Sequence, residues 1–279
     1  MVFCCRNERD RGDFPPSSNR GHVSDNILIQ TKGLYKKFDG LTAVDDVNFE
    51  LKEGETAGII GPNGAGKSTF FNLLTGFFPP TKGKIFFMGQ DITMVPSYHR
   101  VRMGLVRTFQ LVSVFESLTA LNNLVLAKIR FNENYTSKRR FFFKDVRQAE
   151  TVDACLEALQ TVGISDKANV KALELSYGDK RKLEIALALS LNPRILLLDE
   201  PLSGLSDVEI SEVLDLIRLV KKNFTLILIE HKISRITDLV GRLSVMHEGR
   251  LIAEGKPQEV LCEPLVRQVY WGREEVKCS

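Results

Sequence analysis

The chain has 279 residues, of which 43% are hydrophobic and 26% are charged, and its formal net charge is +3. This length and composition suit one or two soluble globular domains with a sizeable core. No apolar run approaches the roughly 20 residues that a membrane-spanning helix needs, so we expect any membrane association to come through a partner. The small net charge and the lack of a long basic block lead us to expect no nucleic-acid partner.

The first ordered elements are predicted to be strands. Residues 1–26 are rich in Arg, Asp, Asn, Ser, Pro and Gly and lack the apolar core of a secretion signal, so we expect a mobile N-terminal extension. From Ile27 onward, ILIQTKGLYKKF and VDDVNFELKEGE are typical of short strands broken by turns. TAGII at 56–60 is predicted to be a buried strand.

A phosphate-binding motif follows that strand directly. GPNGAGKST, residues 61–69, fits G-x-x-x-x-G-K-[ST], and its glycines let backbone N–H groups turn toward phosphates. A helix starting near Lys67 adds its positive dipole end. Lys67 is predicted to reach the β- and γ-phosphates, and Ser68 to ligate Mg²⁺. The alternative is a glycine-rich turn that binds nothing, but the preceding strand and the helical spacing of FFNLLTGF favour a nucleotide site. The expected nucleotide-binding residues here are Gly61, Asn63, Gly64, Gly66, Lys67, Ser68 and Thr69.

Two further apolar runs end in polar side chains. ILLLDE predicts a buried strand that ends at Asp199, a metal ligand, and Glu200, a general base for the attacking water. TLILIEH predicts another that ends at His231, which we expect to donate a hydrogen bond to the γ-phosphate; a surface or capping histidine is the alternative. Three strands that end at phosphate chemistry indicate a parallel sheet with a crevice at its carboxyl edge.

These motifs together resemble the nucleotide-binding subunits of ABC transporters, from about Ile27 to Trp271. LSYGD, residues 175–179, is similar to the signature of that family, and SGLSD, residues 203–207, to its D-loop. The resemblance implies an α/β fold: a P-loop NTPase (RecA-like) core with an antiparallel β subdomain and an inserted α-helical subdomain. The expected boundaries are 27–110 and 186–272 for the core of a single cassette (27–272), 111–185 for the helical lobe with the signature, and 273–279 for a C-terminal tail.

The resemblance also assigns roles to residues outside the P-loop. It implies that Gln110 in GLVRTFQ contacts Mg²⁺ or the water, as a catalytic and metal-binding residue, and senses the membrane partner. It places Phe38 against adenine, with Tyr35 as the less favoured candidate. Ser176 and Gly178 of the signature are expected to bind ATP across a dimer.

The family further implies cofactors and partners. Because the chain has one cassette, a second ATPase subunit, either a copy or a paralogue, is expected to complete each ATP site. ATP and Mg²⁺ are the expected cofactors, and two transmembrane permease subunits and a solute-binding protein are the other expected partners. The chain is therefore expected to be a peripheral protein at the cytoplasmic face of the inner or plasma membrane.

Three stretches are most similar to the branched-chain amino acid uptake group: GPNGAGKSTFFNLLTGFFPPTKGKI, GLVRTFQ and YGDKRKLEIALAL. Urea and short-chain amide uptake ATPases are the first alternative, since SGLSD lies near the urea-type pattern; the lipopolysaccharide-export ATPase is also similar, but RTFQ favours uptake. A soluble non-transport ABC ATPase is another alternative function, although such proteins usually carry two cassettes or long coiled coils. An ATP-binding regulator with little hydrolysis is disfavoured, because Glu200 and His231 fill both catalytic positions.

Several positions depart from the family pattern or leave alternatives open. Asp179 stands where the signature usually has Gln, and the basic run 180–182 is expected to offset part of its charge. Ser206 replaces the usual Asp or Asn of the D-loop, and SDVE predicts a capping box there.

The region before the signature is predicted to be helical. There Val152, Leu156 and Leu159 are expected to share one face. The run Phe141–Phe143 is expected to cap the helical lobe, with a docking surface for a membrane subunit as the alternative.

Overall fold

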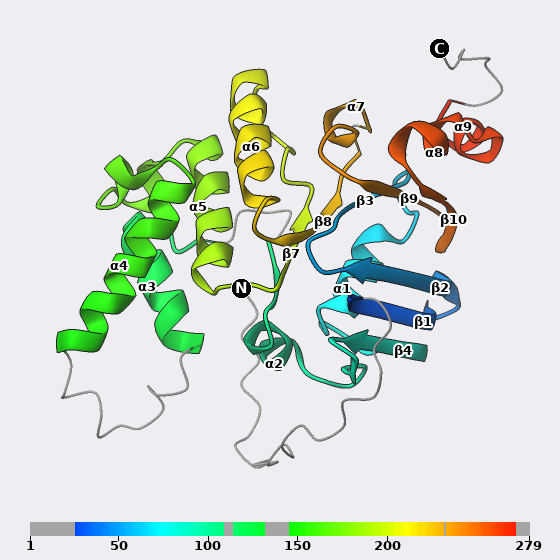
Figure 1. Ribbon diagram of the computed structural model, residues 1–279, viewed down its shortest axis with the longest axis horizontal. Coiled ribbons are helices and arrows are strands. Elements are labelled where there is room, and N and C mark those ends of the chain that lie inside the picture. Colours follow the sequence, from blue (N-terminus) through cyan, green and yellow to red (C-terminus); the bar gives the residue numbers. More distant parts are fainter. Residues whose placement is uncertain (1–25, 109–113, 132–144, 232, 272–279) are drawn as a thin grey trace.

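The computed structural model describes residues 26–108, 114–131, 145–231 and 233–271. The predictions for residues 1–25, Gln110 and Phe141–Phe143 lie outside these residues. The described chain forms two sheets and a group of helices (Figure 1). None of its described helices is both long and apolar enough to cross a membrane.

The larger sheet has six strands in the order β10-β9-β3-β8-β7-β6. Strands β3, β6, β7, β8 and β9 run parallel to one another, and β10 pairs with β9 in the antiparallel direction. Their bounds are β3 (Thr56–Ile60), β6 (Leu105–Arg107), β7 (Ile195–Asp199), β8 (Thr225–Ile229), β9 (Arg242–His247) and β10 (Arg250–Gly255). Because the parallel strands share one carboxyl edge, the segments that follow β3, β7 and β8 meet there, as the sequence predicts.

The smaller sheet is antiparallel, in the order β2-β1-β4-β5. Its bounds are β1 (Ile27–Phe38), β2 (Leu41–Lys52), β4 (Lys82–Phe87) and β5 (Gln90–Asp91). The two predicted N-terminal strands are therefore present and form one hairpin.

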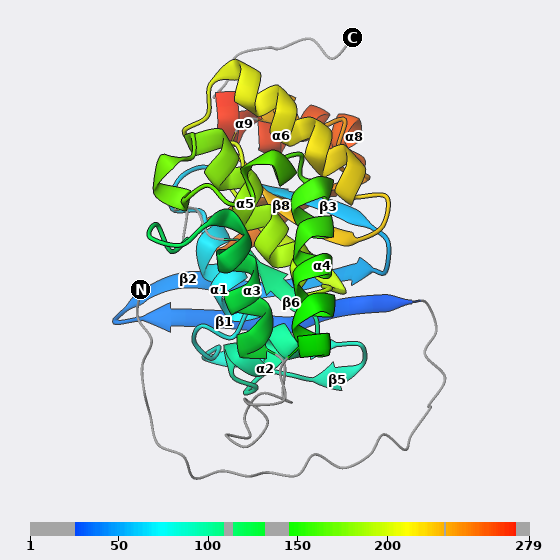
Figure 2. The same ribbon diagram turned by 90° about the vertical axis from the view of Figure 1, so that its left-hand side faces the viewer.

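The helices gather mainly on the side of the large sheet that is away from the small one (Figures 1 and 2). Helices α3, α4 and α5 form one group beside the sheet, with α6 next to them. The bounds are α1 (Lys67–Leu74), α2 (Ser97–Arg102), α3 (Ala120–Phe131), α4 (Asp145–Thr161), α5 (Tyr177–Ser190), α6 (Asp207–Val220), α7 (Ile233–Ile236), α8 (Pro257–Cys262) and α9 (Pro264–Trp271). Two 3-10 turns, η3 (Ser165–Lys167) and η4 (Ala172–Glu174), precede α5. The predicted lobe boundary at residue 185 falls inside α5.

The central strands are buried on both faces because alternate side chains serve two cores. In β7, Ile195 and Leu197 join the core between the two sheets, where α1 contributes Phe70 and Phe71. Leu196 belongs to the opposite core, with residues of α4, α5 and α6. This alternation explains why residues 195–198 (ILLL) are a continuous apolar run and not an alternating one.

Helix α4 corrects one detail of the predicted pattern. Cys155 and Leu159 are fully buried, whereas Leu156 is 37% exposed. The buried stripe therefore runs through Thr151, Cys155 and Leu159, and not through Leu156 as expected. An apolar residue at helical spacing lies one position off the buried face, because the packing of α4 against α3 and α5 sets the rotation of the helix.

Candidate nucleotide-binding site

The P-loop joins β3 to α1, and two of its glycines are required by their surroundings. Gly66 has φ 101° and is the residue before α1. A Cβ on Gly66 would lie 2.3 Å from the carbonyl oxygen of Ala43, and one on Gly61 would lie 2.2 Å from that of Met246. Both approaches are too close for any side chain, so the loop is held tightly against the chain on both sides.

Lys67, at the first position of α1, is 5% exposed. Its Nζ donates to the carbonyl oxygens of Gly61 at 2.7 Å and of Pro62 at 3.0 Å. Burial lowers the pKa of Lys67, and the nearby Glu200 and Asp199 carboxylates oppose this shift. The P-loop ammonium therefore lies within electrostatic reach of both acids at the end of β7.

Asp199 is the last residue of β7 and is 3% exposed. Its Oδ2 forms an ion pair of 2.6 Å with Arg107, while its Oδ1 is buried without a hydrogen-bond partner among the described residues. A buried carboxylate oxygen without a partner is unfavourable, so the site is suited to a cation or a water bound to one.

Glu200 adopts φ 48°, a left-handed conformation that is uncommon for a residue with a side chain. Its backbone N–H donates to Ile229 at 3.0 Å, which ties the end of β7 to the end of β8. His231 is hydrogen-bonded through Nε2 to the Glu200 carboxylate. Backbone strain of this kind persists where the surroundings impose it, and here it aims an acid at the edge of the sheet.

Glu230 is an acid in this region that none of the sequence motifs predicts. It is 4% exposed, and its Oε1 accepts a hydrogen bond of 3.0 Å from the backbone N–H of Leu202. Burial raises the pKa of Glu230 to about 7, although the backbone N–H groups of Leu202 and His231 oppose the shift. The available signal was its position between an apolar strand and the candidate histidine.

The signature lies at the start of α5, where Ser176 is the N-cap and accepts a hydrogen bond from the Asp179 N–H. The Asp179 carboxylate pairs with Lys167 at 2.6 Å, and the hydrogen bonds from Lys167 and Ser176 lower the pKa of Asp179 against the effect of burial. The Gly178 N–H donates to Glu209 of α6 at 2.9 Å. The signature is therefore joined to the D-loop helix.

The basic residues after Asp179 form their ion pairs elsewhere, but the Lys182 charge still helps to lower the pKa of Asp179, so the run offsets part of its charge through Lys182. Lys180 pairs with Glu116, Arg181 with Glu184 and Lys182 with Glu212. These pairings follow from the turn of the helix, which points consecutive side chains in different directions. The main counter-charge is Lys167, which comes from η3 and not from the signature itself.

Phe38 lies at the end of β1 and is 40% exposed. Its ring packs edge-on against Phe78, with centroids 5.3 Å apart, and the Lys36 ammonium lies 5.0 Å from its centroid. Tyr35 instead makes a hydrogen bond with Thr42. Phe38 is thus a partly exposed aromatic residue, whereas Tyr35 is part of the sheet contacts.

The predicted residues divide into two groups. The P-loop, Asp199, Glu200 and His231 lie at the carboxyl edge of the large sheet, where Ser68 and Thr69 open α1. Ser176 and Gly178 lie on the helical group, with hydrogen bonds to Asp179 and Glu209 and not to the P-loop. Asn63 and Gly64 are exposed at the turn of the loop.

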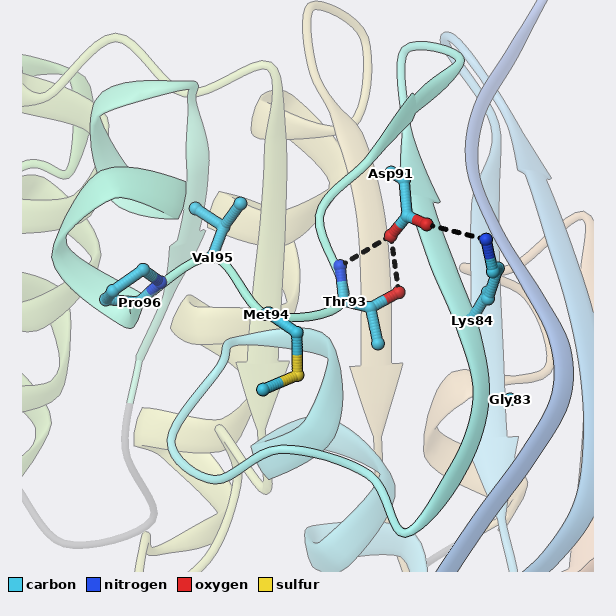
Figure 3. A pocket seen from close by; sticks show the side chains of 7 residues that line it. All are labelled: Gly83, Lys84, Asp91, Thr93, Met94, Val95 and Pro96. Carbon is cyan, nitrogen blue, oxygen red and sulfur yellow. Dashed lines mark hydrogen bonds and ion pairs between the residues drawn. The ribbon is translucent and has the colours of Figure 1, made fainter. Parts of the chain in front are cut away.

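A pocket of about 560 Å³ lies elsewhere, between strands β4 and β5 and the segment that leads into α2 (Figure 3). Lys84 and Asp91 form an ion pair of 3.1 Å on its wall, and Asp91 also accepts a hydrogen bond from Thr93. None of the predicted site residues lines this pocket. The pocket is therefore separate from the nucleotide-binding site.

A P-loop lysine, two acids and a histidine at one edge of a parallel sheet define a P-loop nucleotide-binding protein. The model of the family described as ABC transporter matches residues 44–203. The chain is 38% identical to the high-affinity branched-chain amino acid transport ATP-binding protein LivG of Escherichia coli strain K12, over 88% of this chain and 98% of the relative. The chain belongs to the ABC transporter family and is an ABC-type ATPase.

Solved structures agree with this assignment and confirm the predicted fold. One is an ATP-binding cassette of an ABC transporter in its ADP conformation, which is 31% identical to this chain. The match covers 88% of this chain and 99% of the cassette, with a TM-score of 0.78. A dimeric bacterial ABC transporter cassette is 26% identical, covers 82% of this chain and 99% of its own, and has a TM-score of 0.69. The fold is that of a nucleotide-binding P-loop cassette.

Proposed function

We propose that this chain is the ATP-hydrolysing subunit of an importer for branched-chain amino acids, working through separate transmembrane subunits. The observation that supports this most is the convergence of Lys67, Asp199 and Glu200 at one sheet edge. The likeness to a branched-chain amino acid transport ATP-binding protein over 98% of that protein's length supports branched-chain amino acids as the proposed solute.

The phosphate cradle is the P-loop, through the N–H groups near Gly61, Gly64 and Gly66 and the ammonium of Lys67. Asn63 and Thr69 lie on the same loop and helix start, and Phe38 provides the exposed ring for adenine stacking. Lys67 now donates to two loop carbonyls, so it is already held at the loop and needs only to exchange partners when phosphate binds.

The residues present fit Mg²⁺, because Asp199 has a buried Oδ1 without a hydrogen-bond partner among the described residues. Ser68, on the first turn of α1, supplies a hydroxyl ligand, and Gln110, outside the described residues, is the third proposed ligand. When bound, Mg²⁺ neutralises charge that develops on the β- and γ-phosphates.

Glu200 is the proposed general base. Its carboxylate accepts a proton from water as the water oxygen attacks the γ-phosphorus; the bond from that phosphorus to the bridging oxygen breaks, and ADP leaves with the electron pair. His231 holds the Glu200 carboxylate through Nε2 and lies where it can donate to the γ-phosphate instead. Gln110 is the remaining proposed catalytic residue.

A second ATPase subunit, a copy or a paralogue, completes the site in this proposal. Ser176 and Gly178 lie on the helical group and not at the P-loop of the same chain, so they are available to a nucleotide held by a partner. The dimeric state of one similar cassette supports this arrangement. Two permease subunits, a solute-binding protein and a peripheral position at the cytoplasmic membrane face complete the proposal, which keeps the cassette boundaries of 27–110, 111–185 and 186–272.

The test is recovery of the tagged chain from native membranes, followed by identification of its partners and uptake assays with the reconstituted complex. We expect two membrane-spanning subunits and ATP-dependent uptake of leucine, isoleucine or valine that Glu200→Gln abolishes. Uptake of urea or short amides, and not of these amino acids, would contradict the solute. Recovery without membrane subunits would contradict the transport role.

A further inference from the structure

Arg107 is a buried charged residue to which the mechanism above gives no role. It ends β6, and parallel pairing places it beside Leu197, two residues before Asp199. Its Nη2 lies 2.6 Å from Asp199 Oδ2, and the two side chains are 8% and 4% exposed. Because both charges are out of water, removal of either one would leave the other uncompensated.

The other arm of Arg107 contacts the P-loop helix. Its Nη1 donates to Asn72 Oδ1 at 2.6 Å, and its guanidinium lies 5.4 Å from the centroid of the Phe71 ring. Asn72 and Phe71 both belong to α1. Since a guanidinium is planar and rigid, the two arms fix how far the end of β7 lies from α1 more closely than an ammonium would.

The tie to α1 bears on the proposed metal site because of helix spacing. Asn72 is four residues after Ser68, so the two side chains share a face of α1. Arg107 thus links Asp199 to the helix face that carries Ser68. These are the two proposed metal ligands within the described residues.

The ion pair with Arg107 also leaves the two oxygens of the Asp199 carboxylate in different surroundings. Oδ2 is committed to Arg107, while Oδ1 is buried and has no hydrogen-bond partner in the described chain. A carboxylate held at one oxygen presents the other in a fixed direction. That direction is useful only to a ligand that Oδ1 binds, and a buried oxygen without one is unfavourable.

We propose that Arg107 is a positioning residue that fixes Asp199 relative to α1, so that Asp199 Oδ1 and the Ser68 hydroxyl have the spacing that Mg²⁺ requires. The proposal rests on the proposed Mg²⁺-dependent ATP hydrolysis and deepens it. Arg107 acts through Asp199 and Asn72 and is not itself a metal ligand, since its guanidinium has no acceptor atom.

The test titrates a fluorescent ATP analogue onto the protein in excess Mg²⁺ and again in EDTA. The ratio of the two affinities, here called the Mg²⁺ factor, measures how much Mg²⁺ strengthens nucleotide binding. Arg107→Lys keeps the positive charge and loses the rigid fork. We expect its Mg²⁺ factor to fall by about tenfold, with affinity in EDTA close to that of the wild type. Asn72→Ala keeps the ion pair and loses the tie to α1, so its factor should fall in the same direction by a smaller amount.

Asp199→Asn separates failure of this inference from failure of the proposed function. We expect Asp199→Asn to lose the Mg²⁺ factor, and a wild-type factor there would contradict the metal role of Asp199 itself. Loss in Asp199→Asn together with wild-type factors in Arg107→Lys and Asn72→Ala would overturn the role of Arg107. If Arg107→Lys does not fold, as judged by its circular dichroism melt, Asn72→Ala decides the matter alone.

Discussion

The buried Glu230 carboxyl should make the stability of the protein depend on pH. Its folded pKa of about 7 lies above its usual value of 4.5, so the folded chain holds this proton more tightly than the unfolded chain does. The free energy of unfolding should therefore fall as pH rises from about 4.5 to about 7, by about 3 kcal/mol from this group, and level off above that range. Glu230→Gln cannot ionise and should lack this decline.

The measurement is urea unfolding of the wild type and of Glu230→Gln between pH 5 and pH 8. The amide keeps an acceptor for the Leu202 N–H, so the comparison isolates the charge of Glu230. The stability of the variant relative to the wild type should rise across this range. Parallel curves would mean that burial does not raise the pKa of Glu230.

Arg100 should contribute strongly to stability, because it is 1% exposed and binds the carbonyl oxygens at the end of the P-loop helix. Its guanidinium donates to the carbonyl oxygens of Leu73 and Leu74 at 2.8 Å each, and also to those of Val95 and Thr93. Arg100→Ala leaves these buried acceptors without donors and should lower the free energy of unfolding by about 3 kcal/mol or more.

The control for Arg100 is Arg102→Ala on the same helix, where the side chain is exposed. The two variants remove the same kind of side chain from α2, so the comparison measures what the buried hydrogen bonds of Arg100 contribute beyond the loss of an exposed arginine on that helix. Denaturant unfolding should give a far larger loss for Arg100→Ala. Equal losses would contradict the account.

Residues that act through local spacing could be predicted from the sequence, whereas residues that act through the sheet could not. Lys67 follows from the motif, and Asp199 and Glu200 follow from the apolar run before them. Arg107 and Asp199 are 92 positions apart and meet only because β6 and β7 are neighbours. Neither sequence segment indicates that β6 and β7 are neighbours, so the sequence does not predict the Arg107–Asp199 pair.

At the scale of the element, α6 depends on its first turn. Ser206 is the N-cap, and its side chain and that of Glu209 form a reciprocal capping box, as SDVE predicts. Glu209 also accepts the Gly178 N–H, so the same turn holds the signature helix. Ser206→Ala should lower the free energy of unfolding by about 1 kcal/mol.

Ser211→Ala is the matched control for the cap, because Ser211 lies exposed within α6. Alanine is the better helix former at that position, so the free energy of unfolding should stay the same or rise slightly. Thermal or denaturant unfolding of both variants checks the pair. A loss at Ser211 equal to that at Ser206 would show that the cap has no special role.

Element types were predictable where one physical cause dominates. The continuous apolar runs 195–198 and 226–229 predict strands that are buried on both faces, and both strands are present. The rotation of α4 was not predictable, because Leu156 and Cys155 are both apolar and only the packing partners choose between them.

At the scale of the whole molecule, the two halves of the proposed ATP site lie on different parts of the chain. The P-loop, Asp199, Glu200 and His231 share the carboxyl edge of the large sheet, and the signature opens α5 in the helical group. The sequence predicted these separate locations through the family resemblance. Spacing alone does not explain why the signature lies apart from the P-loop in one cassette, because the proposed explanation requires a partner subunit.

The central claim is that this chain hydrolyses ATP with Glu200 as the base. The most direct measurement is phosphate release from Mg²⁺-ATP by the purified wild type and by Glu200→Gln, with ATP affinity measured alongside. We expect the variant to bind ATP about as tightly as the wild type and to lose at least about a hundredfold in rate. A Glu200→Gln variant that hydrolyses ATP at the wild-type rate would contradict the account.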